Sequence, residues 1–380
     1  MRKTINIGDL GTIITGKTPP TTNKNYYGDY AVFIKPTDIS EQSKYTYETE
    51  EMYSKLAAEK YESSLIPKGA ICVPCIGTIG TKMTMTPCDC YTNQSINSII
   101  CNENYDNEYV YYLIKNFLPG LKAYNLGTAS GREYVSKSNF EKIELVAEQD
   151  KEIQKKIGVI LSRYDSLIEN YQKQIKLLGE AAQRLYKEWF IDLHFPGHEN
   201  TNIIDGVPEG WEKKKVGDIT PIITGKKDAN FGTPDGEYPF FTCSQEPIKA
   251  PSFSFDCAAV LLAGNGDFNV KLYRGRFEAY QRTYVLSPYI DSHLYLLFYT
   301  ISANMTKLAA GSSGSTIKFL TKGMIDGINL NVPNDEILRS FNKKVEPIQS
   351  SRESLQSQLR LLTEARDRLL PKLMSGEITI

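Results

Sequence analysis

Histidine pairs at helical spacing can hold a metal ion, and this sequence contains one such pair. His194 and His198 are four positions apart, but Pro196 lies between them and would interrupt the helix that the pair requires. The sequence also lacks the motifs of phosphate-binding loops, dinucleotide-binding turns and nucleophile elbows. We therefore predict no metal site at the histidines and assign no catalytic residue.

Four cysteines have a spacing that loosely resembles a zinc site. Cys72 and Cys75 form a C-x-x-C pair, and Cys88 and Cys90 follow. The first pair, however, lies in a β-rich apolar run, and the second half of the sequence has no comparable set. Free, buried thiols are the simpler interpretation, so no metal is expected here either.

Three glycine-rich segments have the composition of loops that present backbone N–H groups to phosphate. They are AGNGDF (263–268), GTASGR (127–132) and GSSGSTIKF (311–319). Each also fits an ordinary turn between strands, and the sequence leaves both interpretations open.

The charge balance restricts how the chain would bind nucleic acid. The 380 residues include 44 basic and 45 acidic side chains, for a net charge of −1. A protein that holds nucleic acid alone is normally basic, so here the basic residues must be clustered or partners must supply phosphate contacts. No apolar run suggests a membrane span, and seven cysteines without an export signal favour reduced thiols and a cytoplasmic location.

The elements that would position any such residues occur twice. GDLGTIITGK (8–17) matches GDITPIITGK (217–226) at seven of ten positions. GREYVSKSNFEKIELVAE (131–148) likewise resembles STIKFLTKGMIDGINLNVP (315–333). The middles between these landmarks differ in length and sequence. The pattern indicates two copies of one module.

Each copy is followed by a long amphipathic stretch, and these match without a gap: QIKLLGEAAQRLYKEW (174–189) against QLRLLTEARDRLLPKL (358–373). When the first stretch is extended backward to Ile153, its apolar positions recur at intervals of three and four residues. This spacing predicts a helical seam over a helix of about 40 residues. The seam residues are Ile153, Ile157, Ile160, Tyr164, Ile168, Tyr171, Ile175, Leu178, Ala182, Leu185 and Trp189. We expect the two helices to pair as an antiparallel intramolecular coiled coil with approximate two-fold symmetry. The alternative is that each helix packs only on its own module.

Both globular segments mix β-rich runs with one helical run, which predicts an α+β fold. In the first segment the helical run is 107–124, and in the second it is 292–310. The predicted divisions are a first globular segment (1–147), a first long helix (148–190), a connector (191–210), a second globular segment (211–333), and a second long helix with the C-terminal tail (334–380).

Phrases spread over the whole chain resemble one known family. They are RDRLLPKLMSGEI (366–378), RLYKEWFIDLHFPG (184–197), FIKPTDI (33–39), GTIGT with NQSINSI (77–81 and 93–99) and RTYVLSP (282–288). Together with two variable segments, each followed by a similar helix, they resemble the specificity subunit of type I restriction–modification complexes. The resemblance implies two tandem target-recognition domains and no catalytic activity in this chain.

The resemblance further implies that each domain reads one half of a bipartite double-stranded DNA target, while the coiled coil sets the spacer. Two methyltransferase (modification) subunits would dock on the helices and use S-adenosylmethionine to methylate adenine, so this chain needs no cofactor of its own. Motor–nuclease (restriction) subunits would complete the complex. Membrane association is not expected.

Sequence reading requires side chains that offer hydrogen bonds to base edges, while Lys and Arg near phosphates set the register. In the first domain the candidates are Lys17, Lys35, Thr37, Lys82, Asn93, Gln94, Arg132 and Lys137. In the second they are Lys226, Lys227, Ser244, Gln245, Lys271, Arg274, Arg276, Arg282, Ser315 and Lys318. Lys17 and Lys226 occur in both copies, and Asn93 and Gln94 belong to a family-like phrase, so we expect phosphate or scaffold roles for these four.

Other functions remain open on the sequence alone. A related system with a different subunit arrangement would use the same recognition role. A scaffold protein would join partners through the paired helices without reading DNA. An enzyme with an unrecognised motif is the third alternative.

Overall fold

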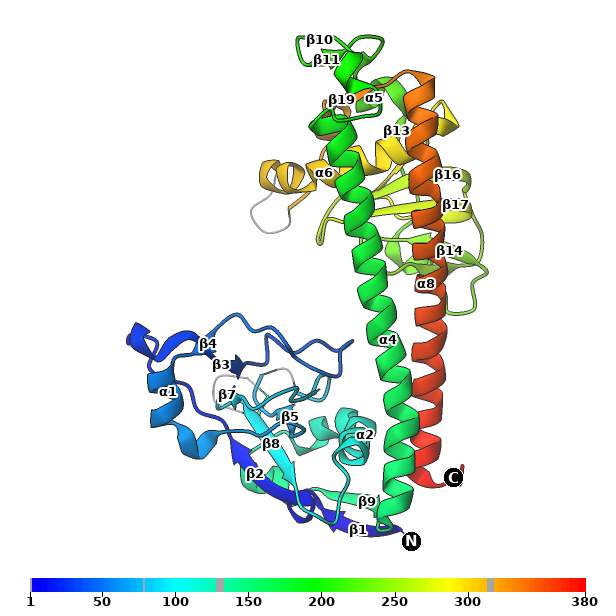
Figure 1. Ribbon diagram of the computed structural model, residues 1–380. Coiled ribbons are helices and arrows are strands. Elements are labelled where there is room, and N and C mark those ends of the chain that lie inside the picture. Colours follow the sequence, from blue (N-terminus) through cyan, green and yellow to red (C-terminus); the bar gives the residue numbers. More distant parts are fainter. Residues whose placement is uncertain (1, 78, 128–132, 313–317) are drawn as a thin grey trace. The chain divides into compact units, whose positions relative to one another are not determined.

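A computed structural model describes residues 2–77, 79–127, 133–312 and 318–380 (Figure 1). The chain divides into two compact units, one formed by Met1–Lys173 with Leu355–Ile380 and the other by Gln174–Ser354. None of the helices within the described ranges is both long and apolar enough to cross a membrane.

Each unit combines one globular segment with parts of two long helices, α4 (Lys151–Tyr186) and α8 (Asp335–Ser375). The globular segments contain both short helices and sheets. The predicted α+β class with two long helices is therefore confirmed.

The first globular segment contains three small sheets, with strand orders β1–β9, β2–β8–β5–β6 and β4–β3–β7. The strands are β1 (Arg2–Asn6), β2 (Gly11–Thr15), β3 (Tyr27–Ile34), β4 (Met52–Tyr53), β5 (Ile71–Pro74), β6 (Thr84–Met85), β7 (Tyr91–Thr92), β8 (Ile96–Cys101) and β9 (Glu144–Glu148). The helices are α1 (Lys55–Lys60), α2 (Asn107–Phe117) and α3 (Lys137–Glu141). The predicted helix over 107–124 is α2 continued by a 3-10 turn, Leu118–Tyr124.

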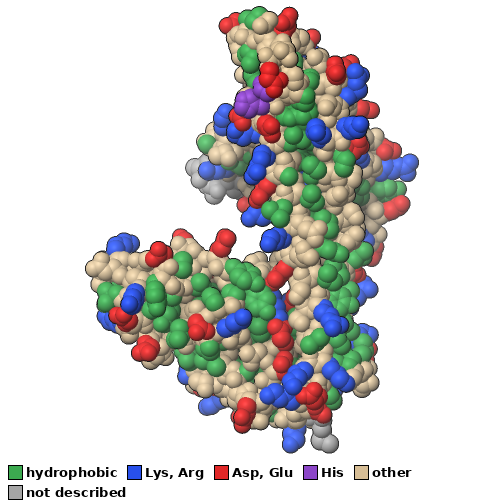
Figure 2. Space-filling view, viewed as in Figure 1, with side chains coloured by type: hydrophobic (Ala, Val, Ile, Leu, Met, Phe, Trp, Pro, Cys, Tyr) green, Lys and Arg blue, Asp and Glu red, His purple; other side chains and the backbone are tan. Residues whose placement is uncertain are grey.

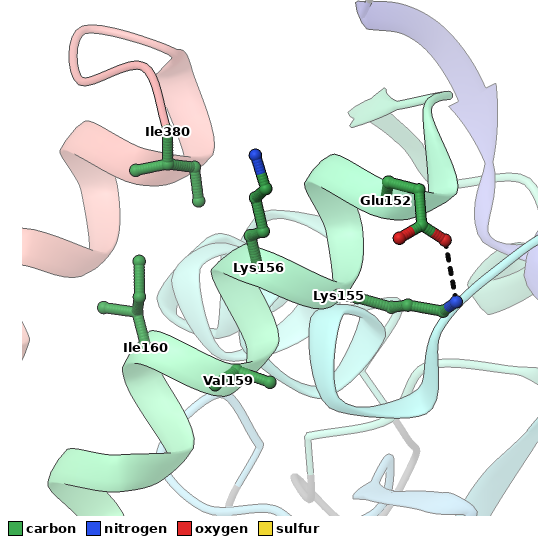
Figure 3. A pocket seen from close by; sticks show the side chains of 6 residues that line it. All are labelled: Glu152, Lys155, Lys156, Val159, Ile160 and Ile380. Atoms are coloured by element: carbon green, nitrogen blue, oxygen red, sulfur yellow. Dashed lines mark hydrogen bonds and ion pairs between the residues drawn. The ribbon is translucent and has the colours of Figure 1, made fainter.

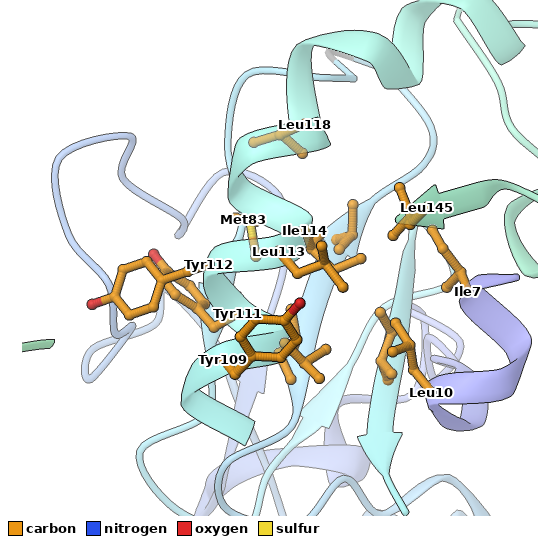
Figure 4. Packing of buried hydrophobic residues seen from close by; sticks show 14 of the residues in the cluster. Ile7, Leu10, Met83, Tyr109, Tyr111, Tyr112, Leu113, Ile114, Leu118 and Leu145 are labelled. Atoms are coloured by element: carbon orange, nitrogen blue, oxygen red, sulfur yellow. The ribbon is translucent and has the colours of Figure 1, made fainter. Parts of the chain in front are cut away.

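The core of the first unit lies between α2 and the sheets. Figure 4 shows Leu113 and Ile114 of α2 facing Ile7, Leu10 and Leu145. All five side chains are buried, and burying a Leu or Ile contributes about 1.5–3 kcal/mol.

The second globular segment has a six-stranded sheet of order β13–β18–β16–β17–β14–β15 and a separate β12–β19 pair. These strands are β12 (Glu212–Lys215), β13 (Ile222–Thr224), β14 (Tyr238–Phe241), β15 (Ile248–Ala250), β16 (Phe255–Ala263), β17 (Val270–Ala279), β18 (Thr283–Leu286) and β19 (Asn329–Val332). The helices are α5 (Val216–Ile219), α6 (Leu294–Gly311) and α7 (Lys322–Asp326). α6 is the helix predicted over 292–310, and it packs on β16 and β17.

The segment predicted as a connector contributes Phe195 to the second core, although most of its residues are exposed. Its Phe195 and the following Trp211 are 3% and 7% exposed, and their rings lie 4.7 Å apart between centroids. Between them lies a hairpin of β10 (Ile203–Ile204) and β11 (Val207–Pro208). The aromatic side chains explain this placement, because a buried ring contributes more to stability than a solvated linker can.

The two long helices run antiparallel within each unit. In the first unit Asp165 of α4 contacts Arg366 of α8. In the second, Trp189, just after α4, contacts Phe341 of α8. Gly179 of α4 also lies beside Arg352 of α8 in the second unit, so the α8 residue number falls there as the α4 number rises. The predicted seam residues are all buried or half-buried. The coiled-coil prediction is confirmed.

The ends of both helices also enter the globular cores, so the helices pack on the modules as well as on each other, and the alternative that each helix packs only on its own module is wrong. Ile157 of α4 and Leu373 of α8 belong to the first core. Tyr186 of α4 and Phe341 of α8 belong to the second. Each core thus takes one end of both helices.

In each module the strand just before the opening phrase pairs with the strand in the closing phrase. Asn6 of β1 lies opposite Glu144 of β9, and Lys215 of β12 lies opposite Asn329 of β19. Both partners have the same positions in their repeats. The ends of the module are therefore held together by one small antiparallel ladder, which leaves the middle free to vary.

A short helix precedes the closing strand in both modules, where the sequence analysis predicted no helix besides 107–124 and 292–310. Ser136 caps α3 by accepting from the Asn139 N–H, and Thr321 caps α7 by accepting from the Met324 N–H. Ser and Thr are strong N-cap residues. This cap was the signal in the sequence that we missed.

Candidate nucleic-acid interface

One edge of the first globular segment gathers four of the predicted residues. The Lys17 N–H donates to the Thr92 carbonyl at 2.9 Å, and the Asn93 N–H donates to the Ile34 carbonyl at 3.1 Å. The ends of β2, β3 and β7 therefore meet here. As a result Lys17, Lys35, Asn93 and Gln94 lie close together, although the sequence separates them by many positions.

The glycine of the repeated IITGK phrase makes this edge possible. A Cβ on Gly16 would lie 2.1 Å from the Thr92 carbonyl oxygen, and a Cβ on Gly225 would lie 1.9 Å from that of Ala279. Ordinary van der Waals contact begins at 3.4 Å. Both glycines are required by the close approach of another strand, so this part of the phrase has a scaffold role.

The second globular segment repeats three backbone hydrogen bonds of this edge. The Tyr280 N–H donates to the Phe241 carbonyl at 3.0 Å, as the Asn93 N–H does to the Ile34 carbonyl, so Thr242 is the counterpart of Lys35. The Gly225 N–H donates to the Thr283 carbonyl at 3.1 Å, and in the first segment the Gly16 N–H donates to the Ile96 carbonyl at 3.2 Å. Likewise, the Gly264 N–H donates to the Arg282 carbonyl at 2.8 Å, and the Cys75 N–H donates to the Ser95 carbonyl at 2.7 Å.

These bonds make Arg282 the counterpart of Ser95 and Gln281 the counterpart of Gln94. Gln281 is a residue that sequence reasoning missed. The only signal was a shared glutamine in NQSI and YQRT, which is too short to align.

The candidates of the first segment have different surroundings. The Lys35 ammonium contacts Glu50 at 2.8 Å and Glu51 at 3.1 Å. Burial lowers the pKa of Lys35, but these two carboxylates outweigh it and leave the pKa above its ordinary value. Lys35 is thus already neutralised by protein groups.

The remaining candidates of the first segment are more open. Lys17, Thr37 and Gln94 are exposed, while Lys82 and Asn93 are half-buried. The Asn93 side chain accepts from the Ser95 N–H at 3.1 Å, which suits the scaffold role expected for it.

Lys137 is not placed at this edge. It begins α3, which packs against the turn Ile7–Leu10, and it contacts Glu141 at 3.6 Å. Arg132 and Ser315 lie outside the described residues.

In the second segment one group of candidates surrounds the edge. Lys271 donates to the Ser244 carbonyl at 2.7 Å. The Gln281 N–H donates to the Lys227 carbonyl at 2.9 Å, which brings Lys226 and Lys227 beside Arg282. Lys226, Ser244, Gln245, Arg282 and Lys318 are exposed.

Two candidates of this group already have partners within the protein. The Lys227 ammonium lies 4.3 Å from the centroid of the Phe231 ring. Burial lowers the pKa of Lys271, since desolvation disfavours its charged form.

Arg274 and Arg276 form a second group on β17. They are two residues apart and so share one face of the strand, opposite to the face of Lys271. The Arg274 guanidinium lies 5.3 Å from the centroid of Tyr295 on α6, and that of Arg276 lies 5.0 Å from the centroid of Phe253. Arg276 also contacts Asp256 at 3.1 Å. The structure therefore divides the second set of candidates between two surfaces.

The surface charges are mixed. Figure 2 shows Lys and Arg interspersed with Asp and Glu over the face in view. This distribution agrees with the net charge of −1. It supports the expectation that partners would share the phosphate contacts.

The cysteine prediction is confirmed for three residues and wrong for one. Cys72, Cys75 and Cys90 are buried and free, but Cys88 is exposed. Burial raises the pKa of both the Cys72 and the Cys75 thiol to about 12. Within the described ranges no group of three His, Cys, Asp or Glu side chains is arranged to hold a metal ion.

The histidine pair follows the π-helical turn Lys187–Ile191, and His198 begins a short 3-10 helix, His198–Asn200, so the two residues do not share an α-helix. The two rings are 5.2 Å apart between centroids, and His198 Nδ1 lies 2.9 Å from the Phe195 carbonyl oxygen. Gly266 in the AGNGDF segment has φ +68°, as a turn residue does.

Comparison with known proteins identifies the family. The family model for the type I restriction modification DNA specificity domain matches residues 2–178 and 208–351. The EcoDI type I restriction enzyme specificity subunit of Escherichia coli is 36% identical over 46% of this chain, and the match spans 40% of that protein. The MjaIX specificity subunit of Methanocaldococcus jannaschii is 26% identical over 98% of this chain and 93% of its own length.

A solved structure shares the fold. The S subunit of a type I restriction–modification system from M. genitalium superposes with a TM-score of 0.65 at 16% identity, over 98% of this chain and 96% of that one. The two matched regions of the family model each cover one of the globular segments described above. The chain belongs to the type I restriction–modification DNA specificity family.

Proposed function

We propose that this chain is the DNA-sequence specificity subunit of a type I restriction–modification complex. It is non-catalytic, and each globular segment reads one half of a bipartite double-stranded DNA target. The observation that carries this proposal is one backbone framework built twice with different side chains on it. Ser95 and Arg282 occupy equivalent points, as do Lys35 and Thr242. Two edges with the same backbone and different side chains suit the recognition of two different half-site sequences.

The residues at the edges divide into two roles. Lys17 and Lys226 are exposed and the same in both copies, so they would contact phosphates, which carry no sequence information. Arg282 differs from its counterpart and is exposed, so it would contact base edges. Arg274 would do the same from the second surface. Lys35 would act as scaffold because Glu50 and Glu51 already bind it.

The partners we propose are two methyltransferase subunits docked on the helices and motor–nuclease subunits beyond them. Support comes from large apolar side chains that the helices expose: Val159, Leu167, Leu177 and Leu361 are between 43% and 57% exposed. S-adenosylmethionine would be bound by the methyltransferase partners, in the cytoplasm.

A shallow hollow of about 270 Å³ in the first unit adjoins one of these side chains. Figure 3 shows Ile160 and Ile380 facing each other across it, with Lys156 beside them. Its rim carries Lys156 and the Lys155–Glu152 ion pair. The apolar floor therefore suits a protein partner that presents apolar groups with an acidic group opposite Lys156.

The test is to co-express the chain with its methyltransferase partner and to sequence the modified DNA by a single-molecule method. We expect methyladenine in a two-part motif with a constant gap. A scaffold protein would give no such motif, and its absence with partner and cofactor present would refute the proposal.

Single variants then show which globular segment reads which half-site. Arg274→Ala should relax only the half-site read by the second segment, because Arg274 lies on β17. Arg368→Ala is the matched control, since Arg368 lies on α8 with its side chain 78% exposed. An equal effect of Arg274→Ala on both half-sites would indicate a general role in folding or phosphate binding.

A further inference from the structure

The helix pair contains a buried ion pair in the first unit. The Asp165 carboxylate of α4 accepts from Arg366 of α8 and from the Tyr112 hydroxyl of α2, both at 2.6 Å. The side chains of Asp165 and Arg366 are only 6% and 10% exposed. One carboxylate therefore joins three elements.

The equivalent position in the second unit is neutral. The sequences of α4 and α8 align without a gap, which places Gln349 at the position of Asp165 and Ala182 at the position of Arg366. Gln349 donates to the Tyr299 hydroxyl of α6, so the contact to the globular segment is kept. Gln349 is 4% exposed and Ala182 is fully buried. The second layer lacks the carboxylate and has the small Ala182 in place of an arginine, while Arg352 donates to the Gln349 side-chain oxygen at 3.0 Å.

The register of α4 against α8 also predicts which residues would face each other if a helix paired with the same helix of a second copy. Asp165 faces Arg366 in the first unit, and Gly179 lies beside Arg352 in the second. This register places Ala182 opposite Gln349. If α4 paired with α4 of a second copy in the aligned register, Asp165 would face Ala182. If α8 paired with α8, Arg366 would face Gln349.

Such like-with-like pairing would remove the partner of a buried carboxylate. Asp165 would keep the Tyr112 hydroxyl but lose the guanidinium that donates to it, twice in every symmetric dimer. Arg366 would still contact Asp367 at 2.8 Å, so the penalty falls mainly on the pairing of α4 with α4. A buried ion pair is strongly unfavourable to break, because the remaining charge is left without compensation.

We propose that the Asp165–Arg366 pair makes helix pairing selective: α4 accepts α8 of its own chain and rejects α4 of a second copy. The apolar seams alone do not provide this selectivity, because they are alike in the two helices. The pair thereby keeps two different modules in one subunit. The inference goes beyond DNA reading and does not depend on it.

Moving the arginine tests this directly in the full-length chain. In A182R/R366A the arginine sits at the aligned position of α4, so α4 paired with α4 satisfies Asp165 and the intrachain pairing does not. We expect wild type to refold from urea as a monomer over a range of concentrations. The variant should associate to dimers at least about a hundredfold more strongly, measured as mass by size-exclusion chromatography with light scattering.

A second variant is needed because an arginine at the buried position of Ala182 could prevent folding. D165Q/Q349D exchanges the aligned Asp and Gln, so that α8 paired with α8 gains the ion pair. The shift toward dimers should be smaller, because Arg352 lies 3.0 Å from the Gln349 side-chain oxygen and would partly compensate the new carboxylate within one chain. E364Q/R368Q, which removes an exposed ion pair on α8, is the control and should stay monomeric.

The outcomes decide the proposal. Dimers in either double variant, with a monomeric wild type and control, support it. A wild-type chain that refolds into dimers overturns it. So does a variant that folds with a cooperative transition yet stays as monomeric as wild type.

Discussion

Replacing Gly16 by alanine should disrupt the recognition edge of the first segment and leave the second intact. The new Cβ would lie 2.1 Å from the Thr92 carbonyl oxygen, against an ordinary contact of at least 3.4 Å, so the backbone must move by about 1.3 Å. That movement breaks two hydrogen bonds, from Gly16 to Ile96 and from Lys17 to Thr92.

The size of the effect follows from these two bonds. The groups are largely buried, so each lost bond leaves donors and acceptors unsatisfied at a cost of about 2 kcal/mol, or about 4 kcal/mol together. For a unit of this size that corresponds to a fall in Tm of about 8–16 °C. Differential scanning calorimetry of the wild-type and variant chains measures it.

Two further variants make the comparison sharp. Gly225→Ala should cause a similar loss in the second segment, since its Cβ would lie 1.9 Å from the Ala279 carbonyl. Gly323→Ala is the control, because Gly323 lies in α7 with nothing within 4 Å of its added Cβ.

The assembled methyltransferase complex should show the same division. At permissive temperature Gly16→Ala should relax one half-site and Gly225→Ala the other. The reasoning is refuted if Gly16→Ala is as stable as Gly323→Ala, or if both edge variants affect the same half-site.

Three more perturbations have defined outcomes. Arg366→Ala should lower the free energy of unfolding by about 3 kcal/mol in urea titrations, because it removes the guanidinium that donates to the buried Asp165 carboxylate; a loss below about 1 kcal/mol would contradict this. Burial and then repulsion from Asp165 raise the pKa of Glu169, so its protonated form is favoured in the folded state and stability falls as the pH rises above the ordinary value of 4.5. The Glu169→Gln variant should therefore become more stable relative to wild type as the pH rises above 4.5. A difference in Tm between variant and wild type that does not change with pH would argue against this. Lys17→Ala and Lys226→Ala should each reduce the slope of log binding constant against log salt concentration by about 0.9, and an unchanged slope would assign these lysines to the scaffold.

Much of the fold could be predicted because its signals are local. A seam with intervals of three and four residues depends only on helical geometry, so α4 was predicted with its buried face. The repeat of GDLGTIITGK revealed two modules without any structure. The cap at Ser136 was equally local, but the short helix that it begins was not predicted.

The candidate interface was only partly predictable, because side-chain type does not reveal a neighbour. Lys35 looks the same in the sequence as Lys17, but the fold brings Glu50 and Glu51 to Lys35 alone. Arg274 and Lys271 are three residues apart on one strand, and strand alternation places them on opposite faces. Gln281 was missed because its equivalence to Gln94 lies in hydrogen bonds and not in a shared phrase.

The sequence by itself determined that the chain consists of two like modules, each followed by a long amphipathic helix, because repeats and periodicity are written along the chain. Only the tertiary structure decided which residues share an edge and which charges pair. Asp165 and Arg366 are 201 positions apart, and nothing local marks one as the partner of the other. Their pairing depends on the register of two helices. That register is set by packing over the whole seam and by the cost of leaving a buried carboxylate without its cation.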